Sequence, residues 1–578
     1  MLGYRIGRVR RLAVLAIAAL TPGCGGGNIE EATDLAAVAE VLPRPASKVL
    51  LIGLDGADWN VARPLMAAGR LPVLSSLVEG GASGDLHSIE PMISPALWTS
   101  VMTGVVPERH GIRDFVFKLP GSYEQPIVNA TIRERLALWN ILSELGLTVG
   151  VVDWYATWPA ETVNGFMVSD RIKTMGPDTE GVIYPADDSL RATLTDPSPL
   201  ERFPALDRLR RIGEPQPQGL EKALREDLYR FRVAKDLYHT HSPDFFAFYL
   251  KGLDAVGHFY WKHFAPDEEV FGETDAEEIE RLGSIIPDYY ELCDQLLGDF
   301  LKGVDEHTTV LVLSDHGFRA FARPDSLIFD LDRLFEAMGL LEFSDPTLAD
   351  DRAKRKIRMA GTRAYTHEGT MIVSAFGSRD RPVYLNVSGR DPEGLIEHDG
   401  WLEERDKIKA RLESLHTDLD SPLFSRVEIN ELASAAGRQE PDLYLRVNPR
   451  IAFDYEVLID GKPYSLFDSF VWEYGNISGT HRTEGILVAR GPQVRPGVEI
   501  RGASLLDIAP TVLHLAGVPA AGDLDGKPLS GMLVDPDVAS GLRVISYETL
   551  INRERTTVGD TPIDEAYRER LRALGYVQ

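Results

Sequence analysis

The chain has 578 residues, of which 44% are hydrophobic and 26% are charged, a composition typical of a globular protein with a substantial buried core. The formal net charge of −27, with no basic stripe, argues against a protein that binds duplex nucleic acid. An acidic surface also repels an anionic substrate unless bound cations reverse the sign of the charge locally.

The first 24 residues predict an export signal. Arginines are frequent between positions 5 and 11, and the apolar stretch 12–20 is too short to span a bilayer comfortably. With Cys24 close behind, the segment resembles a bacterial lipoprotein signal, in which the cysteine is lipidated; an ordinary secretory signal or an uncleaved anchor is the alternative. We expect an exported protein, periplasmic or anchored to the membrane through Cys24. Because Cys293 is the only other cysteine, we expect no intramolecular disulfide and no cysteine-based metal site.

Residues 25–46 contain glycines, acidic residues and two prolines, and predict a linker. The folded region begins with the continuous apolar run 48–54, which is typical of a strand buried on both faces and ends at Asp55-Gly56. Open α/β sheets bind their ligands at the carboxyl ends of parallel strands, so Asp55 is a candidate ligand-binding residue.

The segment from Ser94 to Gly104 predicts a helix, with Ser94 as its N-cap, Pro95 as its first residue and Gly104 as its stop. The free N–H groups and positive dipole end of a helix N-terminus attract anions such as phosphate. A serine there can attack phosphorus only if another group activates it. Most serines in this position are only helix caps, so the motif needs support from the rest of the chain.

Further apolar runs at 148–152, 244–250, 308–313 and 485–489 predict strands, and helix-like sequence such as 132–145 separates them. This alternation predicts an α/β fold with a largely parallel sheet and helices on both faces. Two charged stretches that contain proline, near 160–235 and 345–435, are interpreted as insertions that cap the sheet. The C-terminal segment 536–578 predicts a helical tail.

Carboxylates and imidazoles recur at or after the predicted strand ends. These residues are Asp55, Asp254, His258, Asp315, His316 and His481. Each alone is more often a turn, surface or core residue, but together they supply the oxygen and nitrogen ligands that two divalent ions need. Two such ions can deprotonate a hydroxyl and stabilise an in-line phosphoryl displacement, which is the activation that Ser94 requires.

The order and spacing of these residues resemble the alkaline phosphatase superfamily, specifically its type I phosphodiesterase/nucleotide pyrophosphatase branch. The similar segments are 53–56, Ser94 ten residues before Gly104, 107–112, 254–258, 314–317, 362–365, 386–390, 479–481 and 523–529. The resemblance therefore covers about residues 48–530, and it implies an alkaline-phosphatase-like catalytic domain over residues 48–535 with the two insertions.

The resemblance also implies the roles of the site residues. One ion would be bound by Asp55, Asp315, His316 and the oxygen of Ser94, and the other by Asp254, His258 and His481. Ser94 would be the catalytic nucleophile and form a phosphoseryl intermediate, while His110 would hold the turn after the helix. Zinc suits this ligand set and manganese is the alternative. The expected substrate is a small anionic phosphoester, either a monoester or a diester.

Two comparisons within the superfamily separate this chain from its relatives. The diesterase branch usually has threonine as the nucleophile and asparagine three residues later, where this chain has Ser94 and Leu97. Sulfatases have an arginine where Trp98 stands and an asparagine where His316 stands. We expect a phosphoester hydrolase. A phosphonate or sulfate ester hydrolase on the same fold, and a non-catalytic surface lipoprotein, stay open as alternatives.

Overall fold

The computed structural model describes residues 30–40, 42, 48–118, 126–212, 219–271, 274–321, 327–345, 347, 370–374, 381–431, 433, 440–448, 455–473, 477–535 and 542–551. The predicted signal segment with Cys24, the motif 362–365 and most of the predicted tail lie outside these residues. No helix within the described ranges is both long enough and apolar enough to cross a membrane.

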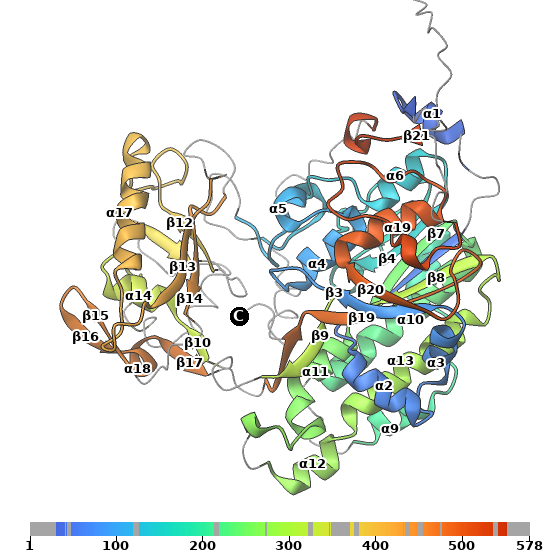
Figure 1. Cartoon of the computed structure of the whole chain (residues 1–578), viewed down its shortest axis with the longest axis horizontal. Helices are drawn as coiled ribbons and strands as arrows, with labels where there is room; N and C mark the ends of the chain where they lie inside the picture. The colour runs from blue at the N-terminus through green and yellow to red at the C-terminus, as the bar shows by residue number, and fades with distance from the viewer. Residues whose placement is uncertain are drawn as a thin grey trace, which may run out of the picture.

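A nine-stranded sheet forms the centre of the larger unit in the described residues (Figure 1). Its order is β20-β3-β19-β8-β2-β7-β4-β5-β6. The strands are β2 (Lys48–Leu54), β3 (Ala82–His87), β4 (Val149–Trp154), β5 (Gly165–Ser169), β6 (Ile183–Tyr184), β7 (Phe245–Leu250), β8 (Thr308–Leu313), β19 (Glu484–Arg490) and β20 (Val498–Ser504). Only β19 and β6 run antiparallel to their neighbours, so the predicted largely parallel α/β sheet is confirmed.

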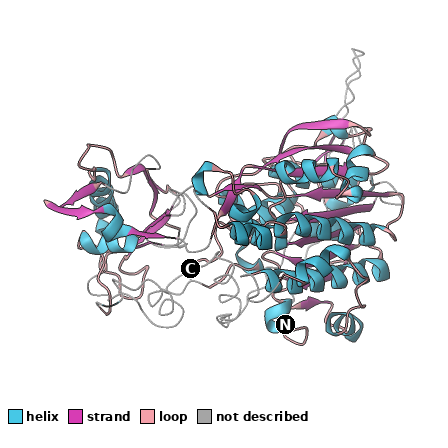
Figure 2. Ribbon diagram, turned by 90° about the horizontal axis from the view of Figure 1, so that it is seen from below, coloured by secondary structure: helices cyan, strands magenta, loops and turns pink. Residues whose placement is uncertain are grey.

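Both faces of the sheet are covered by helices, as Figure 2 shows for the larger unit. Along β2, Leu50 and Ile52 pack into one hydrophobic cluster, whereas Val49 and Leu51 pack into the other. Helices α2 (Trp59–Ala67), α3 (Pro72–Glu79), α10 (Leu220–His241), α11 (Gly252–Phe264) and α13 (Ile285–Leu301) contribute to the first cluster; α4 (Ser94–Thr103), α6 (Leu138–Glu144) and α19 (Ile508–Leu515) contribute to the second. Burial on both faces explains why the strand sequences are continuously apolar.

The stretch 160–235 is not a separate cap, which differs from the interpretation of the sequence. It contributes β5 and β6 to the central sheet, and α8 (Asp188–Thr195), α9 (Pro204–Arg210) and most of α10 to the main hydrophobic core. These strands are short, and the helices are amphipathic and rich in charge, so the stretch lacks the apolar runs that mark the other strands.

Part of the predicted linker also belongs to the fold. Strand β1 (Glu30–Glu31) pairs with β21 (Leu542–Arg543), and helix α1 (Leu35–Glu40) buries Val38 against the larger unit. The described part of residues 25–46 is therefore packed onto the domain instead of extending as a tether.

The chain between β9 (Gly317–Ala320) and β18 (Gly479–Arg482) forms a second, smaller unit, on the left of Figure 1. It has its own hydrophobic core and an antiparallel sheet of order β11-β12-β14-β13. Its elements are β10 (Leu327–Phe329), α14 (Leu331–Ala337), β11 (Ile372–Ser374), β12 (Arg381–Leu385), α17 (Trp401–Glu413), β13 (Phe424–Ile429), β14 (Leu443–Val447), β15 (Glu456–Ile459), β16 (Lys462–Ser465), α18 (Leu466–Phe470) and β17 (Val471–Glu473). Its described elements run from Leu327 to Glu473, beyond the predicted insertion 345–435 at both ends.

Two antiparallel strand pairs, β9 with β18 and β10 with β17, carry the chain into the smaller unit and back. Ion pairs also connect the units: Lys118 binds Asp391, and Arg113 binds Glu440 and the hydroxyl of Tyr444. Strand β9 begins directly after Asp315-His316, and its partner β18 contains His481.

Candidate metal centre and nucleophile

The first candidate ligand group lies where two adjacent parallel strands end. Asp55 follows β2, and Asp315 and His316 follow β8, so the carboxyl ends of paired strands bring these residues together. His316 Nε2 lies 3.5 Å from Asp55 Oδ1 and 3.6 Å from Asp315 Oδ2. All three side chains are buried, and one ligand atom from each lies within 4.8 Å of the others.

The second group lies beside the first. Asp254 and His258 are one turn apart on α11, which follows β7, the other neighbour of β2. His481 reaches them from β18: its Nε2 is 3.2 Å from Asp254 Oδ1 and 3.0 Å from His258 Nε2. His316 Nε2 is 3.7 Å from Asp254 Oδ1. The structure thus brings all six residues together, in the two groups that the resemblance implies.

Backbone carbonyls orient the three imidazoles. The Nδ1 atoms of His258, His316 and His481 lie 2.9, 3.1 and 3.2 Å from the carbonyl oxygens of Gly479, Gly317 and Met92. A carbonyl only accepts hydrogen bonds, so each Nδ1 carries the proton and donates it. In the neutral imidazoles each Nε2 then keeps a lone pair that is available to a cation. Hydrogen bonds at the second nitrogen are the usual support of histidines that bind metal ions.

The electrostatics of the site favour a cation. Burial, with the nearby charge of Asp254, raises the pKa of Asp55 to about 8, and burial with the charges of Asp55 and Asp254 raises the pKa of Asp315 well above its usual value. Burial opposes ionisation of Asp254 as well, but the imidazoles of His258 and His481 lower its pKa. Asp254 Oδ2 and His316 Nε2 make no hydrogen bond within the described residues. Buried carboxylates and imidazoles with unused lone pairs fit divalent cations with oxygen and nitrogen ligands.

Ser94 differs from the prediction in one respect. Helix α4 begins at Ser94, Ile93 is the N-cap, and no side chain caps the helix, so the prediction of Ser94 as an N-cap is wrong. Its buried Oγ has no hydrogen-bond partner among the residues that the structure describes. Two residues before it, the Met92 carbonyl accepts from His481 Nδ1, and one turn after it, Trp98 Nε1 donates to Asp55 Oδ2. Contacts to both ligand groups therefore flank the free hydroxyl of Ser94.

His110 occupies a structural position, in agreement with its expected role. It ends α5 (Pro107–His110), and the Ile112 N–H donates to its Nδ1 at 3.2 Å, so its Nε2–H donates to Ser100 Oγ at 2.9 Å. Burial, together with the charges of Arg133 and Arg113, lowers the pKa of His110 to about 3. The neutral ring ties α4 to the turn that follows it.

This buried histidine makes the stability of the fold sensitive to acid. The unfolded chain takes up a proton on His110 below pH 6.5, whereas the folded chain does so only near pH 3, so stability falls as the pH drops through this window. As the pH drops, we expect the free energy of unfolding of His110→Gln to fall less steeply than that of the wild type. The two slopes should differ by about 1.4 kcal/mol per pH unit. Urea unfolding in the upper part of the window measures the two slopes. The exposed His307→Gln is the control, and parallel curves for wild type and His110→Gln would refute the role of His110.

The sequence patterns do not indicate Phe318, which lies two residues after His316. The centroid of its ring lies 5.0, 5.5 and 5.7 Å from the ring centroids of His258, His481 and His316. A Cβ added at Gly56 or Gly257 would lie 2.6 or 2.7 Å from this ring, so glycine at both positions leaves the space that the ring occupies. The signal in the sequence is the pair of glycines, one directly after Asp55 and one directly before His258.

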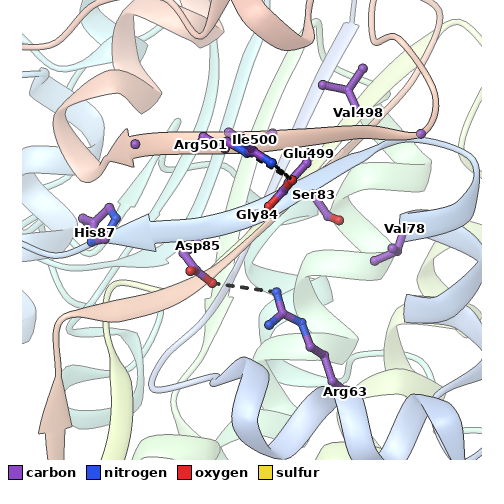
Figure 3. Close-up of a pocket in the computed structure, with 12 residues that line it drawn as sticks. Arg63, Val78, Ser83, Gly84, Asp85, His87, Val498, Glu499, Ile500 and Arg501 are labelled. Atoms are coloured by element: carbon purple, nitrogen blue, oxygen red, sulfur yellow. Dashed lines mark hydrogen bonds and ion pairs between the residues drawn. The ribbon is translucent and has the colours of Figure 1, made fainter.

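A groove of about 420 Å³ lies elsewhere, along the edge strand β20 and its neighbour β3, and Figure 3 shows its lining. Its charged side chains pair with one another, Arg63 with Asp85 at 3.9 Å and Arg501 with Glu499 at 2.6 Å. None of the candidate ligands lines this groove, so it is separate from the metal centre.

Comparisons with known proteins show what the chain is similar to. No curated protein matches it. Among solved structures, human ectonucleotide pyrophosphatase/phosphodiesterase 5 is 13% identical with a TM-score of 0.46, and the match covers 84% of this chain and all of that one. Phosphonoacetate hydrolase from Sinorhizobium meliloti 1021, in complex with phosphonoformate, is 15% identical with a TM-score of 0.46, and the match covers 83% of this chain and 97% of that one.

The model of the type I phosphodiesterase/nucleotide pyrophosphatase family matches residues 49–460. This range contains Ser94 and every candidate ligand except His481, which the fold brings to the site from β18. The chain therefore belongs to the type I phosphodiesterase/nucleotide pyrophosphatase family, a metal-dependent family of hydrolases that act on phosphoester bonds.

Proposed function

We propose that this enzyme is a two-metal phosphoesterase in which Ser94 is the nucleophile. Asp55, Asp315, His316 and the Ser94 oxygen would hold one divalent ion, and Asp254, His258 and His481 the other; zinc is expected and manganese is the alternative. The observation that carries the proposal is the meeting of six candidate ligands in two groups, of which Asp55 and His481 are hydrogen-bonded to the segment that carries Ser94, whose buried hydroxyl has no hydrogen bond among the described residues. A drifted, non-catalytic relative would not be expected to keep all of these features.

The proposed reaction consists of two displacements at phosphorus. When bound, the two ions lower the pKa of a hydroxyl and balance the negative charge of the phosphoryl oxygens. In the first step, Ser94 Oγ gives its proton to solvent and forms a bond to phosphorus, while the bond to the leaving oxygen breaks and that oxygen takes up a proton. In the second step, the oxygen of water forms a bond to phosphorus and the bond to Ser94 Oγ breaks, and the proton that the water loses restores the Ser94 hydroxyl. The dipole of α4 favours the added negative charge at its N-terminus.

The substrate in this proposal is a small anionic phosphoester. Leu97 is fully buried in a hydrophobic cluster and offers no polar contact to a phosphate oxygen. Trp98 points its indole N–H at Asp55, so it does not replace the arginine that sulfatases use. The Trp98 position favours phosphoesters over sulfate esters, whereas the Leu97 position lacks the contact that the diesterase branch makes to a phosphate oxygen and so weighs against nucleotide diesters.

We also propose that the enzyme acts outside the cytoplasm, anchored through a lipidated Cys24. The proposal rests on residues 1–24, which lie outside the described part of the chain. Labelling with a radioactive fatty acid tests it: the wild-type chain should take up label and Cys24→Ser should not. Equal labelling of both chains would refute the anchor.

A substrate screen with metal-reconstituted enzyme tests the proposed function. We expect turnover of phosphate monoesters or diesters that appears when zinc or manganese is added to the metal-free chain, with slower turnover of sulfate esters. The panel should contain monoesters, diesters, phosphonates and sulfates, all with the same p-nitrophenol leaving group where the chemistry allows it. Turnover limited to sulfates, or equal rates with and without metal, would contradict the proposal.

A further inference from the structure

The residue one turn after the proposed nucleophile makes a direct contact with a candidate metal ligand. Trp98 Nε1 donates a hydrogen bond of 3.2 Å to Asp55 Oδ2, and both side chains are buried. The other oxygen, Asp55 Oδ1, accepts no hydrogen bond within the described residues and lies 3.5 Å from His316 Nε2. The two oxygens of Asp55 therefore have different surroundings: Oδ2 accepts the hydrogen bond from the indole, and Oδ1 faces the other residues of the ligand group.

The indole is itself held in place from three sides. Trp98 lies over Gly53, where an added Cβ would be 2.5 Å from the ring, and its ring centroid is 4.8 Å from that of Tyr249 and 5.1 Å from that of Trp154. Trp154 Nε1 also donates to the backbone carbonyl of Trp98 at 3.0 Å. Gly53 lies two residues before Asp55, so the strand that carries the ligand also supplies the space for the ring.

We propose that Trp98 is a positioning residue for the group Asp55, Asp315 and His316, in which its N–H fixes Asp55 Oδ2 and directs Oδ1 at the ion. This inference rests on the proposed function. Residues four apart on a helix share a face, so Ser94 and Trp98 lie on the same side of α4. One helix thereby sets the position of the attacking hydroxyl and the orientation of a ligand of the ion that activates it.

Trp98→Phe separates this role from simple packing. The phenyl ring keeps an aromatic side chain next to Tyr249, but it removes both the N–H and the distal ring atoms that lie over Gly53, so a matched Trp→Phe control is needed. The matched control is Trp139→Phe: Trp139 on α6 donates an equally buried indole hydrogen bond of 2.8 Å to Glu161, a carboxylate that belongs to neither ligand group. Both variants lose one indole–carboxylate bond, but only one of the two bonds supports a candidate ligand.

The experiment is a titration of the metal-free full chain with Co²⁺, followed by its visible absorption and by calorimetry. For Trp98→Phe we expect one of the two binding steps to weaken by about 10- to 100-fold, the usual effect of losing a hydrogen bond to a metal ligand, while the other step stays at the wild-type value. Trp139→Phe should bind both ions as the wild type does. Wild-type affinity at both steps in Trp98→Phe, or equal weakening in Trp139→Phe, would overturn the inference.

A second measurement needs no variant. The NMR resonance of the Trp98 indole N–H should shift when Zn²⁺ is added to the metal-free wild-type chain, whereas that of the Trp139 indole should not. A Trp98 resonance that stays fixed through the titration overturns the inference even if Trp98→Phe does not fold. A wild-type chain that takes up no cobalt, zinc or manganese instead refutes the proposed function, so the two failures are distinguishable.

Discussion

Replacing Ser94 by alanine is expected to lower kcat by roughly 10³- to 10⁶-fold, the range seen when the nucleophile of a covalent mechanism is removed. The hydroxyl has no hydrogen bond in the described structure, so its loss leaves no buried group without a partner and should cost little stability. Hydrolysis of p-nitrophenyl phosphate esters measures the rate, and metal content and circular dichroism establish that the fold and the ions are retained.

A control on the same helix makes the result specific. Thr103→Ala also removes a buried hydroxyl from α4, one that donates only to the carbonyl of Thr99 at 2.9 Å, and its rate should stay within a few-fold of wild type. A Ser94→Ala enzyme that keeps a rate similar to that of Thr103→Ala would remove Ser94 from the mechanism.

Removal of the divalent ions is expected to abolish turnover and also to destabilise the fold. Without a cation the buried carboxyl of Asp55 has a pKa of about 8 against 3.8 when unfolded, so its contribution to stability is lost as the pH rises between these values. A site saturated at 100 times its dissociation constant stabilises the folded chain by about 2.7 kcal/mol. Urea unfolding with and without a chelator, near both ends of this pH window, measures the effect.

The sign of the pH dependence provides the internal control. The chelated chain should lose stability relative to the metal-loaded chain as the pH rises, and excess zinc should restore it. Equal unfolding curves at both pH values, with and without chelator, would contradict the assignment of the two ligand groups.

The candidate ligands could be predicted because each belongs to a local pattern. Asp55 and Asp315 end continuous apolar runs that form buried parallel strands, and Asp254 and His258 have the spacing of one helical turn. Those strands are adjacent in the sheet, so their carboxyl ends meet. His481 is different: it lies on β18, after the smaller unit, and it stands a few residues before the apolar run 485–489 instead of after an apolar run, so its local pattern is weaker.

Contacts made through the backbone could not be predicted from residue types. The carbonyls of Gly479, Gly317 and Met92 fix the three imidazoles, and no side chain indicates them. The position of Ser94 inside α4 could not be predicted either, because Ser-Pro at a helix start usually forms a cap. Here the helix begins one residue earlier than that pattern predicts, and the hydroxyl is left free.

The short strands account for the main difference in the fold. β5 and β6 have five and two residues, and they lie in a stretch where charge and proline suggest an insertion. β5 pairs with β4 and β6 pairs with β5, and this pairing assigns both strands to the central sheet. Strand pairing between distant segments is a tertiary property, so such short elements have little signal of their own.

The stereochemical course at phosphorus tests the central proposal most directly. A phosphorothioate diester of known configuration would be hydrolysed in isotopically labelled water, and the configuration of the product determined. Two successive in-line displacements, the first by Ser94 and the second by water, predict overall retention. Inversion would show that water attacks the substrate directly, and it would contradict the role of Ser94 as the nucleophile.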